Sequence, residues 1–277
     1  MTTAMTMNKD YLEEIEKELY DLLSSRKDLY PTTLYEAMEY ALFPAGKRIR
    51  PYLSYLTADF VGVNKFKIKP LALSVELIHN YSLIHDDMPC MDNDEYRRGK
   101  FTCHKKFGEA TALLAGDALL NLAFENLLVA VGNDPDLATS ATIIAECAGG
   151  SGMIGGQAIE LTNEYFDEAL VTELCKKKTG ALINAAVMSV AVLSGERKKI
   201  SSLGTYAGCV GLCYQLVDDL LDEDKEEKKS FLGVMGKEET IVRIDRLTEL
   251  LHRTMSPYGK EGQELLRFGQ YLSERKK

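Results

Sequence analysis

Apolar residues recur at intervals of three and four along most of this chain, and stretches that alternate with a period of two are nearly absent. The first pattern is that of an α-helix with one buried face, so the sequence predicts an all-α protein. Residues 69–87 are apolar on nearly every side, which predicts a central helix covered by others. Further helices are expected over residues 10–25, 111–131, 138–147, 168–193, 202–222, 238–254 and 261–274.

Breaks in this pattern are short, and the clearest lie at residues 132–135 and 194–196. Pro31, Pro51 and Pro70 each precede an apolar run and suit the first turn of a helix. No linker rich in Gly, Ser or Pro divides the chain. We therefore expect a single domain over residues 1–277, a point that length alone does not decide.

The composition excludes several classes of protein. The net charge is −9 and the Lys and Arg residues are scattered, whereas binding of nucleic acid needs a basic face. No stretch approaches the roughly 18 apolar residues that a membrane span needs. The six cysteines form no CxxC pair, and no apolar N-terminal run suggests secretion. We expect reduced core thiols in a cytoplasmic protein.

Two of the predicted helices end in groups of aspartates. These are Asp86, Asp87 and Asp92, called the first aspartate cluster, and Asp218, Asp219 and Asp222, called the second aspartate cluster. Asp218 and Asp222 are four residues apart, which puts both carboxylates on one helix face. Asp86 and Asp92 are six apart, but Pro89 between them blocks regular helical bonding. A local loop there would return Asp92 to the first pair.

Aspartates at a helix end are most often a solvated surface. Here, however, the other faces of both helices are apolar, so we expect the carboxylates to meet inside the mouth of the bundle. They repel one another and the negative end of the helix dipole, at a cost on the order of 1 kcal/mol or more for each like pair. A cation must offset this repulsion. Oxygen ligands without His or Cys favour Mg²⁺, which usually takes one or two carboxylates plus substrate phosphates.

Basic motifs accompany the aspartates. Each basic group alone is more often solvated than functional, but arginine binds phosphate oxygens through paired hydrogen bonds and lysine acts as a point charge. Their coincidence with the aspartates favours a magnesium site for phosphates. The motifs are Gly46-Lys47-Arg48-Ile49-Arg50-Pro51, Arg97-Arg98-Gly99-Lys100 and Lys178-Thr179-Gly180.

This ordered set of motifs, with Gln-x-x-Asp-Asp-x-x-Asp at residues 215–222, resembles that of the trans-isoprenyl diphosphate synthases and is most similar to bacterial farnesyl diphosphate synthases. The resemblance covers nearly the whole chain, from about residue 10 to about residue 275. It implies a helical bundle around a deep central cavity, a homodimer, and three Mg²⁺ ions shared with the substrate diphosphate. The implied reaction is the magnesium-dependent condensation of isopentenyl diphosphate with the allylic dimethylallyl and geranyl diphosphates, which gives farnesyl diphosphate.

The resemblance also implies residue roles. Both aspartate clusters, with Asp219 in the second, would hold Mg²⁺ against the allylic diphosphate. Because the metal would stabilise the negative charge on the departing diphosphate, no Ser, Cys or His nucleophile is needed. Taken alone, His79 would be an ordinary helix histidine. By the same resemblance, Arg97 and Lys178 would contact the allylic diphosphate. The pocket for isopentenyl diphosphate would consist of Lys47, Arg50, His79 and Arg98. The carbocation would be contacted by Thr179 and Gln215.

Tyr81 and Ser82 are the candidates for setting product length. Tyr81 precedes Asp86 by five residues, which on a helix places it roughly 7.5 Å below that aspartate. A large ring there would form a floor that stops chain growth, although plain core packing of Tyr81 is an alternative. The family resemblance likewise associates an aromatic residue at this position with a C15 product.

Three other functions stay open at this point. A synthase of C20 products shares every motif except the Tyr81 floor. A phosphohydrolase that uses His85 and Asp86 as metal ligands would leave the second aspartate cluster unexplained. A non-catalytic partner subunit is conceivable because about a dozen residues of the family pattern are absent after Asp222.

The sequence departs from the family pattern at two places. Ala45 stands where the family usually has the first of two glycines. After Asp222, the family's Gly-Lys pair has no counterpart, and Lys229-Ser230-Phe231 is what remains of a Lys-Ser/Thr-Thr-Tyr/Phe element. Lys229 is therefore the substrate-binding candidate of the segment that would close over the diphosphate.

Overall fold

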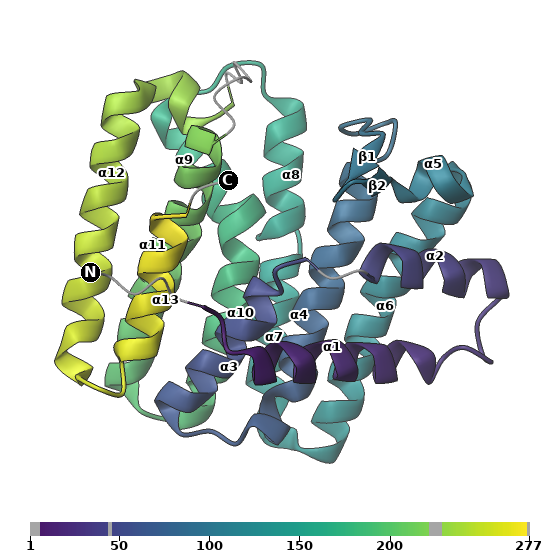
Figure 1. The fold of residues 1–277 in the computed structure, drawn as a ribbon, viewed down its shortest axis with the longest axis horizontal. Helices are drawn as coiled ribbons and strands as arrows, with labels where there is room; N and C mark the ends of the chain where they lie inside the picture. The colour runs from purple at the N-terminus through teal and green to yellow at the C-terminus, as the bar shows by residue number, and fades with distance from the viewer. Residues whose placement is uncertain (1–5, 44–45, 222–228, 276–277) are drawn as a thin grey trace. The chain divides into compact units, whose positions relative to one another are not determined.

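A computed structural model of the chain describes residues 6–43, 46–221 and 229–275 (Figure 1). Within these ranges the chain is helical almost throughout, and its strands are two segments of two residues each. The all-α class predicted from the helical period is confirmed. Apolar side chains at every third and fourth residue give each helix a face that is best buried against other helices.

The described residues fall into two compact units. The N-terminal unit comprises residues 7–52 and 69–135, and the C-terminal unit comprises residues 53–68 and the described residues from 136 onwards. The chain passes from one unit to the other inside α3 (Ile49–Val61) and again inside α4 (Lys65–Asp86). The single domain expected over residues 1–277 stays a prediction.

Helix α1 shows how the apolar period is used in the N-terminal unit. Its apolar positions Ile15, Leu19 and Leu23 are buried, and the side chain of Asn8 caps the helix by accepting from the backbone N–H of Asp10 over 2.9 Å. Helix α2 packs against α5 and α6. The bounds are α1 (Lys9–Ser24), α2 (Thr32–Leu42), α5 (Cys103–Phe107) and α6 (Glu109–Asn133).

Helix α4 is bound along α6 by polar contacts as well as by apolar packing. It begins at Lys65, four residues earlier than predicted, so that Pro70 lies inside the helix. The amide of Asn126 on α6 donates to the carbonyl oxygen of Pro70 over 2.9 Å, and Ser74 donates to the carbonyl oxygen of Ala123 over 2.9 Å. These contacts satisfy polar groups of a helix that is buried throughout residues 71–78.

Helix α6 is long and apolar enough, by length and composition, to cross a membrane. The expectation that no stretch of the chain approaches this length was therefore wrong for Glu109–Asn133. A core helix of a soluble protein passes the same test, and one face of α6 is buried through small and apolar residues such as Ala115, Gly116 and Leu119. The opposite face leaves Leu114 and Leu128 more than half exposed, at 57% and 71%.

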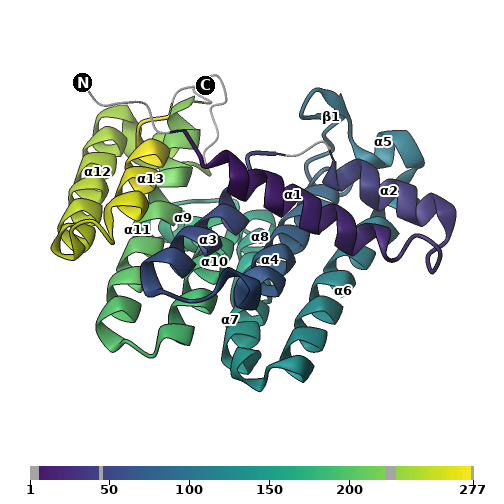
Figure 2. The ribbon, with the colours of Figure 1, turned by 60° about the horizontal axis from the view of Figure 1, so that its bottom comes forward.

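The C-terminal unit is a set of packed helices. Helix α10 is buried on nearly every side and packs against α7 and α11, and α11, α12 and α13 lie side by side in both views (Figures 1 and 2). The bounds are α7 (Ala138–Ala148), α8 (Met153–Thr162), α9 (Glu168–Cys175), α10 (Ala181–Ala191), α11 (Arg197–Leu221), α12 (Phe231–Met255) and α13 (Gln263–Ser273).

Two of these helices differ from their predicted course. Residues 168–193 were expected to form one helix, but a π-helical turn at Lys176–Gly180 separates α9 from α10. Helix α12 begins at Phe231 rather than at residue 238, and it is kinked at Gly236, whose φ is 78°. A positive φ is accessible to glycine at little cost, so the kink is compatible with this sequence.

All six cysteines are free, as expected, and four of them are buried. Burial raises the pKa of Cys103 and Cys213 to about 12. These thiols therefore stay protonated and pack as small apolar side chains.

Candidate active site

The first aspartate cluster lies where α4 ends and the chain folds back on itself. Helix α4 ends at Asp86, and the backbone N–H of Asp92 donates to the carbonyl oxygen of Asp86 over 2.9 Å. Asn93 follows with a φ of 54°, in the left-handed region. The loop expected from Pro89 is thus present, and it returns Asp92 to the end of the helix.

A short hairpin after this loop holds two of the predicted arginines. Strands β1 (Tyr96–Arg97) and β2 (Lys100–Phe101) pair antiparallel, and the rings of Tyr96 and Phe101 stack with their centroids 4.8 Å apart. The two turn residues, Arg98 and Gly99, both have positive φ, at 53° and 76°. A two-residue turn with two positive φ angles is the type I′ turn that suits the twist of a hairpin. This hairpin was not expected from the sequence, although Gly99 is a residue that commonly marks a tight turn.

Arg97 binds the first aspartate cluster directly. Its Nε lies 2.7 and 2.9 Å from the two carboxylate oxygens of Asp87, and its Nη2 lies 2.5 Å from Oδ1. Burial raises the pKa of Asp87, and the contact with Arg97 offsets only part of that rise. Burial alone would lower the pKa of Arg97, but Asp87 reverses this and raises it. The pair is therefore a buried carboxylate with a guanidinium counter-ion at the edge of the site.

The predicted pocket for isopentenyl diphosphate is a cluster of positive charge in the N-terminal unit. The pKa of His79 lies well below its usual value, first because burial disfavours the charged imidazole and then because Arg50 and Arg98 repel a further positive charge. Arg98 also lies against the backbone of Gly46, where an added Cβ would be 2.6 Å from Nη2. Gly46 thus lets the hairpin reach the motif that carries the exposed Lys47. Arg50, His79 and Arg98 thus lie close together, next to the loop that carries Lys47.

Tyr81 is buried one helical turn below the first aspartate cluster, with 5% of its surface exposed. Its ring meets the ring of His85 edge to face at 5.6 Å. His85 in turn packs on Gly116 of α6, where an added Cβ would lie 2.2 Å from Nε2. The hydroxyl of Ser82 donates to the carbonyl oxygen of His79 over 2.9 Å and so is turned toward its own helix. Tyr81 therefore has the fixed position that a floor requires.

The second aspartate cluster begins near the end of α11, and Asp222 lies outside the described residues. Asp218 forms an ion pair with Arg275, whose Nη2 also donates to the carbonyl oxygen of Tyr214 over 2.7 Å. Asp219 accepts from two neutral donors, the amide of Gln215 over 2.9 Å and the backbone N–H of Phe231 over 2.8 Å. The two carboxylates therefore have different partners.

The π-helical turn positions Lys178 and Thr179. A π-helical turn inserted in an α-helix often marks a functional site. The ammonium group of Lys178 pairs with Glu160 of α8, and Thr179 donates to the side-chain oxygen of Gln215 over 2.8 Å. Gly156 allows α8 to approach the turn, because a Cβ there would lie 2.3 Å from the backbone nitrogen of Lys178. Within the C-terminal unit, Lys178, Thr179 and Gln215 are thus brought together.

The segment 229–231 contacts both of these groups. The Nζ of Lys229 donates to the carbonyl oxygen of Glu160 over 2.8 Å, and Ser230 caps α12 by accepting from the backbone N–H of Gly233 over 3.0 Å. The N–H of Phe231 binds Asp219. Residues 229–231, which the resemblance identifies with the family's Lys-Ser/Thr-Thr-Tyr/Phe element, therefore lie next to Asp219 of the second aspartate cluster. The other residues of this segment, 223–228, lie outside the described residues.

The donor set of the first aspartate cluster fits magnesium. Among the described residues, no three His, Cys, Asp or Glu side chains come close enough to hold a metal ion by themselves. His85 is not available as a ligand through Nε2, which lies 3.1 Å from the carbonyl oxygen of Leu113. Carboxylate oxygens therefore remain, and Mg²⁺ completes its shell with water and phosphate oxygens. In the N-terminal unit the aspartates that would hold it are Asp86, Asp87 and Asp92, and in the C-terminal unit they are Asp218 and Asp219.

Four charged residues that contact side chains of the predicted motifs were not expected from the sequence, because their partners are distant along the chain. Glu160 lies on α8, a helix that the glycine-rich residues 149–156 concealed. Arg275 belongs to a basic C-terminal run, which by itself indicates only a solvated end. The four residues are Glu16, Glu76, Glu160 and Arg275.

Comparisons with known proteins identify the family of this chain. The polyprenyl synthetase family model matches residues 31–238. The chain is 35% identical to the farnesyl diphosphate synthase of Micrococcus luteus over 293 residues, which covers 99% of this chain and 98% of the relative. It is 41% identical over 228 residues to large subunit 1 of the heterodimeric geranylgeranyl pyrophosphate synthase of Arabidopsis thaliana, which covers 79% of this chain and 60% of that protein.

A solved structure matches along nearly the whole chain. The apo structure of an FPP/GFPP synthase from Zymomonas mobilis has a TM-score of 0.84 at 35% identity, and the match covers 95% of this chain and 99% of that one. The resemblance inferred from the motifs is confirmed at the level of family and fold. This chain belongs to the polyprenyl synthetase family and is a prenyltransferase.

Proposed function

We propose that this prenyltransferase condenses isopentenyl diphosphate with allylic diphosphates and that its main product is farnesyl diphosphate. The supporting observation is that, in the N-terminal unit, one hairpin carries adjacent arginines to two anion sites of different chemistry. Arg97 contacts Asp87 of the carboxylate cluster, and Arg98 lies against Gly46 of the basic pocket. Condensation needs two such sites, because one diphosphate must depart while the other is retained.

The residues of the two sites suit these different tasks. Mg²⁺ bound by the aspartates would stabilise negative charge on the departing diphosphate. Arg97 presents a fork of N–H donors to the same group of charges. The basic pocket of Lys47, Arg50, His79 and Arg98 would bind the second diphosphate through positive side chains, where its C–O bond stays intact.

The bond changes balance without a protein nucleophile. The bond from C1 of the allylic chain to the diphosphate oxygen breaks, and its electron pair leaves with the oxygen. The double bond of isopentenyl diphosphate then forms the new carbon–carbon bond with the allylic cation. A proton is lost from the new chain, and the departed diphosphate accepts it. Exclusion of water by apolar side chains protects the cation during these steps.

The C-terminal unit would contribute the side-chain dipoles of Thr179 and Gln215 and the charge of Lys178 to the reaction. The Thr179 hydroxyl and the Gln215 amide are held together by a hydrogen bond of 2.8 Å, so both dipoles have fixed directions. Fixed dipoles stabilise a developing positive charge without reorganising during the reaction. Lys178, now paired with Glu160, would exchange this partner for diphosphate oxygens.

The reaction itself is tested with purified protein, isopentenyl diphosphate and each allylic primer in turn, in the presence of Mg²⁺. We expect extension of dimethylallyl and geranyl diphosphates, and loss of activity when EDTA removes the metal. Extension by the homomeric protein would also exclude the role of a non-catalytic subunit. If no primer is extended, the proposed function is wrong.

Tyr81→Ala tests the farnesyl assignment. Relatives of this chain include a farnesyl diphosphate synthase and a subunit of a geranylgeranyl pyrophosphate synthase. Removal of the buried Tyr81 ring opens space below Asp86, so we expect products longer than C15, sized by chromatography of radiolabelled chains. Tyr81→Phe keeps the ring and should keep the C15 product. An unchanged product from Tyr81→Ala would assign chain length to other residues.

Homodimerisation is the remaining part of the proposal. Helix α6 leaves two apolar pairs exposed, Leu113 with Leu114 near its start and Leu128 with Val129 near its end. A second copy of the chain packed along α6 would cover both pairs. Light scattering of the purified protein should give twice the chain mass of 30.9 kDa. A Leu128→Lys variant should shift that mass toward the monomer.

A further inference from the structure

Arg48 lies in the middle of the basic motif, yet it points away from solvent. The residue is 3% exposed, whereas its neighbour Lys47 is exposed. Its φ is 49°, an uncommon backbone conformation for a residue with a side chain. A backbone conformation of this kind persists only where surrounding contacts determine it.

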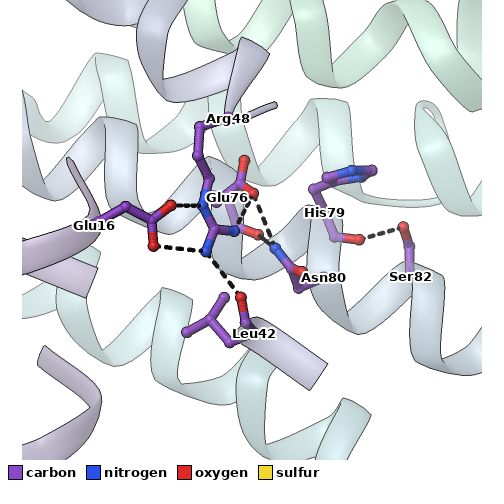
Figure 3. A network of polar contacts seen from close by, with 7 residues as sticks. All are labelled: Glu16, Leu42, Arg48, Glu76, His79, Asn80 and Ser82. Carbon is purple, nitrogen blue, oxygen red and sulfur yellow. Dashed lines mark hydrogen bonds and ion pairs between the residues drawn. The ribbon is translucent and has the colours of Figure 1, made fainter. Parts of the chain in front are cut away.

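Those contacts come from three other segments of the N-terminal unit (Figure 3). The Nε of Arg48 donates to Glu16 of α1 over 2.6 Å, and Nη1 donates to Glu76 of α4 over 2.7 Å. Its Nη2 donates to the carbonyl oxygen of Leu42 over 2.8 Å, at the end of α2. The ring of Phe43 lies 5.8 Å from the guanidinium carbon. Arg48 therefore joins α1, α2 and α4 at one point.

The network continues into the turn of α4 that carries His79. Glu76, which is 2% exposed, accepts from Arg48 and from the amide of Asn80 through the same carboxylate oxygen, the latter over 3.1 Å. The Asn80 amide also donates to the carbonyl oxygen of Glu76 over 2.8 Å. His79 lies between these two residues in the sequence, on the same turn of α4, and Figure 3 shows its ring to one side of the network. The loop that carries Lys47 is thus fixed to the helical turn that carries His79.

The charges of the network also act on the pocket. Two carboxylates surround a single guanidinium, and Glu76 attracts the positive charge of Arg98 while Arg48 repels it. Burial alone would lower the pKa of Arg48, but Glu76 and Glu16 outweigh this and raise it. The guanidinium is therefore charged at neutral pH, as arginine side chains are in proteins.

We propose that Arg48, held by Glu76 and Glu16, is a positioning residue for the basic pocket that binds the diphosphate of isopentenyl diphosphate. It touches no substrate. It acts by holding the backbone between Lys47 and Arg50 at a fixed distance from His79. The inference rests on the proposed function for the identity of the ligand, and it concerns only one of the two anion sites.

A lysine at this position keeps the charge but cannot reach three acceptors at once, because it lacks the planar fork of arginine. We expect Arg48→Lys to raise the KM for isopentenyl diphosphate by about 10- to 100-fold, the range that a small misplacement of binding groups produces. The KM for geranyl diphosphate should change by less than about twofold, since Arg48 acts on the basic pocket and not on the first aspartate cluster. Binding of isopentenyl diphosphate alone, measured by calorimetry, should weaken to the same extent as its KM rises.

Glu76→Gln provides an independent variant that keeps the shape of the side chain and removes the negative charge of Glu76. Its effect on the KM for isopentenyl diphosphate should combine with that of Arg48→Lys less than additively, because both break one contact. If Arg48→Lys fails to fold, Glu76→Gln alone decides the question through the two KM values. The matched control is Arg26→Lys, which alters an Arg–Glu pair of the same unit, Arg26 with Glu125 at 3.7 Å. It should leave both KM values at wild-type level.

The outcomes separate the inference from the proposed function. If the wild-type protein extends no primer, the proposed function fails. If it does extend primers, an equal rise in both KM values overturns the inference, because a general loss of structure would act on both sites. Wild-type KM values in Arg48→Lys and Glu76→Gln would overturn it as well. A rise confined to isopentenyl diphosphate supports it.

Discussion

The two aspartate clusters end similar apolar helices, but they obtain their counter-ions in different ways. In the first cluster, Asp87 is bound by Arg97, ten residues further along the chain on the β1–β2 hairpin. In the second, Asp218 is bound by Arg275, which is 57 residues away at the end of the chain. Asp219 beside it accepts from two neutral donors, the amide of Gln215 and the N–H of Phe231.

This difference indicates that the first cluster is a locally built site. Its loop, hairpin and arginine all come from residues 86–101, so they form together once the type I′ turn closes. The second cluster depends on two segments that follow it, the start of α12 and the residues just after α13. We infer that the first cluster is preorganised for metal and diphosphate, while the second changes its partners more readily.

The largest expected effect comes from Asp87→Asn. This variant keeps the shape of the side chain and removes the charge that would hold magnesium, so we expect turnover to fall by about 10²–10³-fold, as when an electrostatic stabiliser is lost. The measurement is steady-state kcat with geranyl diphosphate and excess Mg²⁺. Asp94→Asn is the matched control, because Asp94 also approaches Arg97, at 3.8 Å, from an exposed position. A turnover of Asp87→Asn near that of the control would remove Asp87 from the metal site.

Asp219→Asn should instead act mainly on stability. The hydrogen bond from the N–H of Phe231 joins α11 to the start of α12, whereas the bond from Gln215 lies within α11, and each contributes about 1 kcal/mol. We expect the Tm to fall by about 2–4 °C for each kcal/mol lost, measured by calorimetry without ligands. Turnover should fall less than in Asp87→Asn. If Asp219→Asn left the Tm unchanged and abolished turnover, the two clusters would be equivalent after all.

A smaller effect is expected from Arg275→Gln, which removes the cation that Mg²⁺ would displace from Asp218. The Mg²⁺ concentration that gives half of the stabilisation by diphosphate should fall by about three- to tenfold, since tenfold corresponds to 1.4 kcal/mol. Thermal melting at a series of Mg²⁺ concentrations measures this. Arg267→Gln on α13 is the control of equal charge, because Arg267 is exposed and, among the described residues, pairs with its neighbour Glu264. A higher Mg²⁺ requirement in Arg275→Gln would show that Arg275 assists the site.

The smallest effect concerns His79 and pH. Its pKa in the folded protein lies below the unfolded value of about 6.5, so the neutral imidazole adds stability above pH 6.5. That stability is lost as the pH falls from 6.5 toward the folded pKa, by at most about 1.4 kcal/mol for each pH unit. Urea unfolding at pH 7.5 and 5.5 should therefore show a shallower pH dependence in His79→Asn than in the wild type. His252→Asn, at an exposed position, should keep the wild-type dependence.

Diphosphate should weaken this effect. Bound anions offset the repulsion from Arg50 and Arg98, so the pKa of His79 should rise when isopentenyl diphosphate binds. NMR titration of the imidazole with and without the ligand measures this shift. A pKa that does not move would place His79 outside the pocket. His79 belongs to the N-terminal unit, so this titration reports on that unit.

Much of the fold and part of the site followed from the sequence. Most of the helices expected from the apolar period are present, because that period reflects burial of one helix face. Pro89 correctly predicted the loop that returns Asp92 to Asp86. Helix α8 was missed because its glycines conceal the period, yet Gly156 is what allows α8 to approach the turn that holds Lys178.

The sequence by itself determined the family, the all-α class and the candidate residues, because each of these depends on residue type and on spacing along a single helix. Only the tertiary structure decided the partners of those residues: Arg97 for Asp87, Arg275 for Asp218, Glu160 for Lys178, and Glu76 with Glu16 for Arg48. An ion pair between distant residues leaves no pattern in a single sequence. The two aspartate clusters, alike as sequence motifs, are for this reason different as sites.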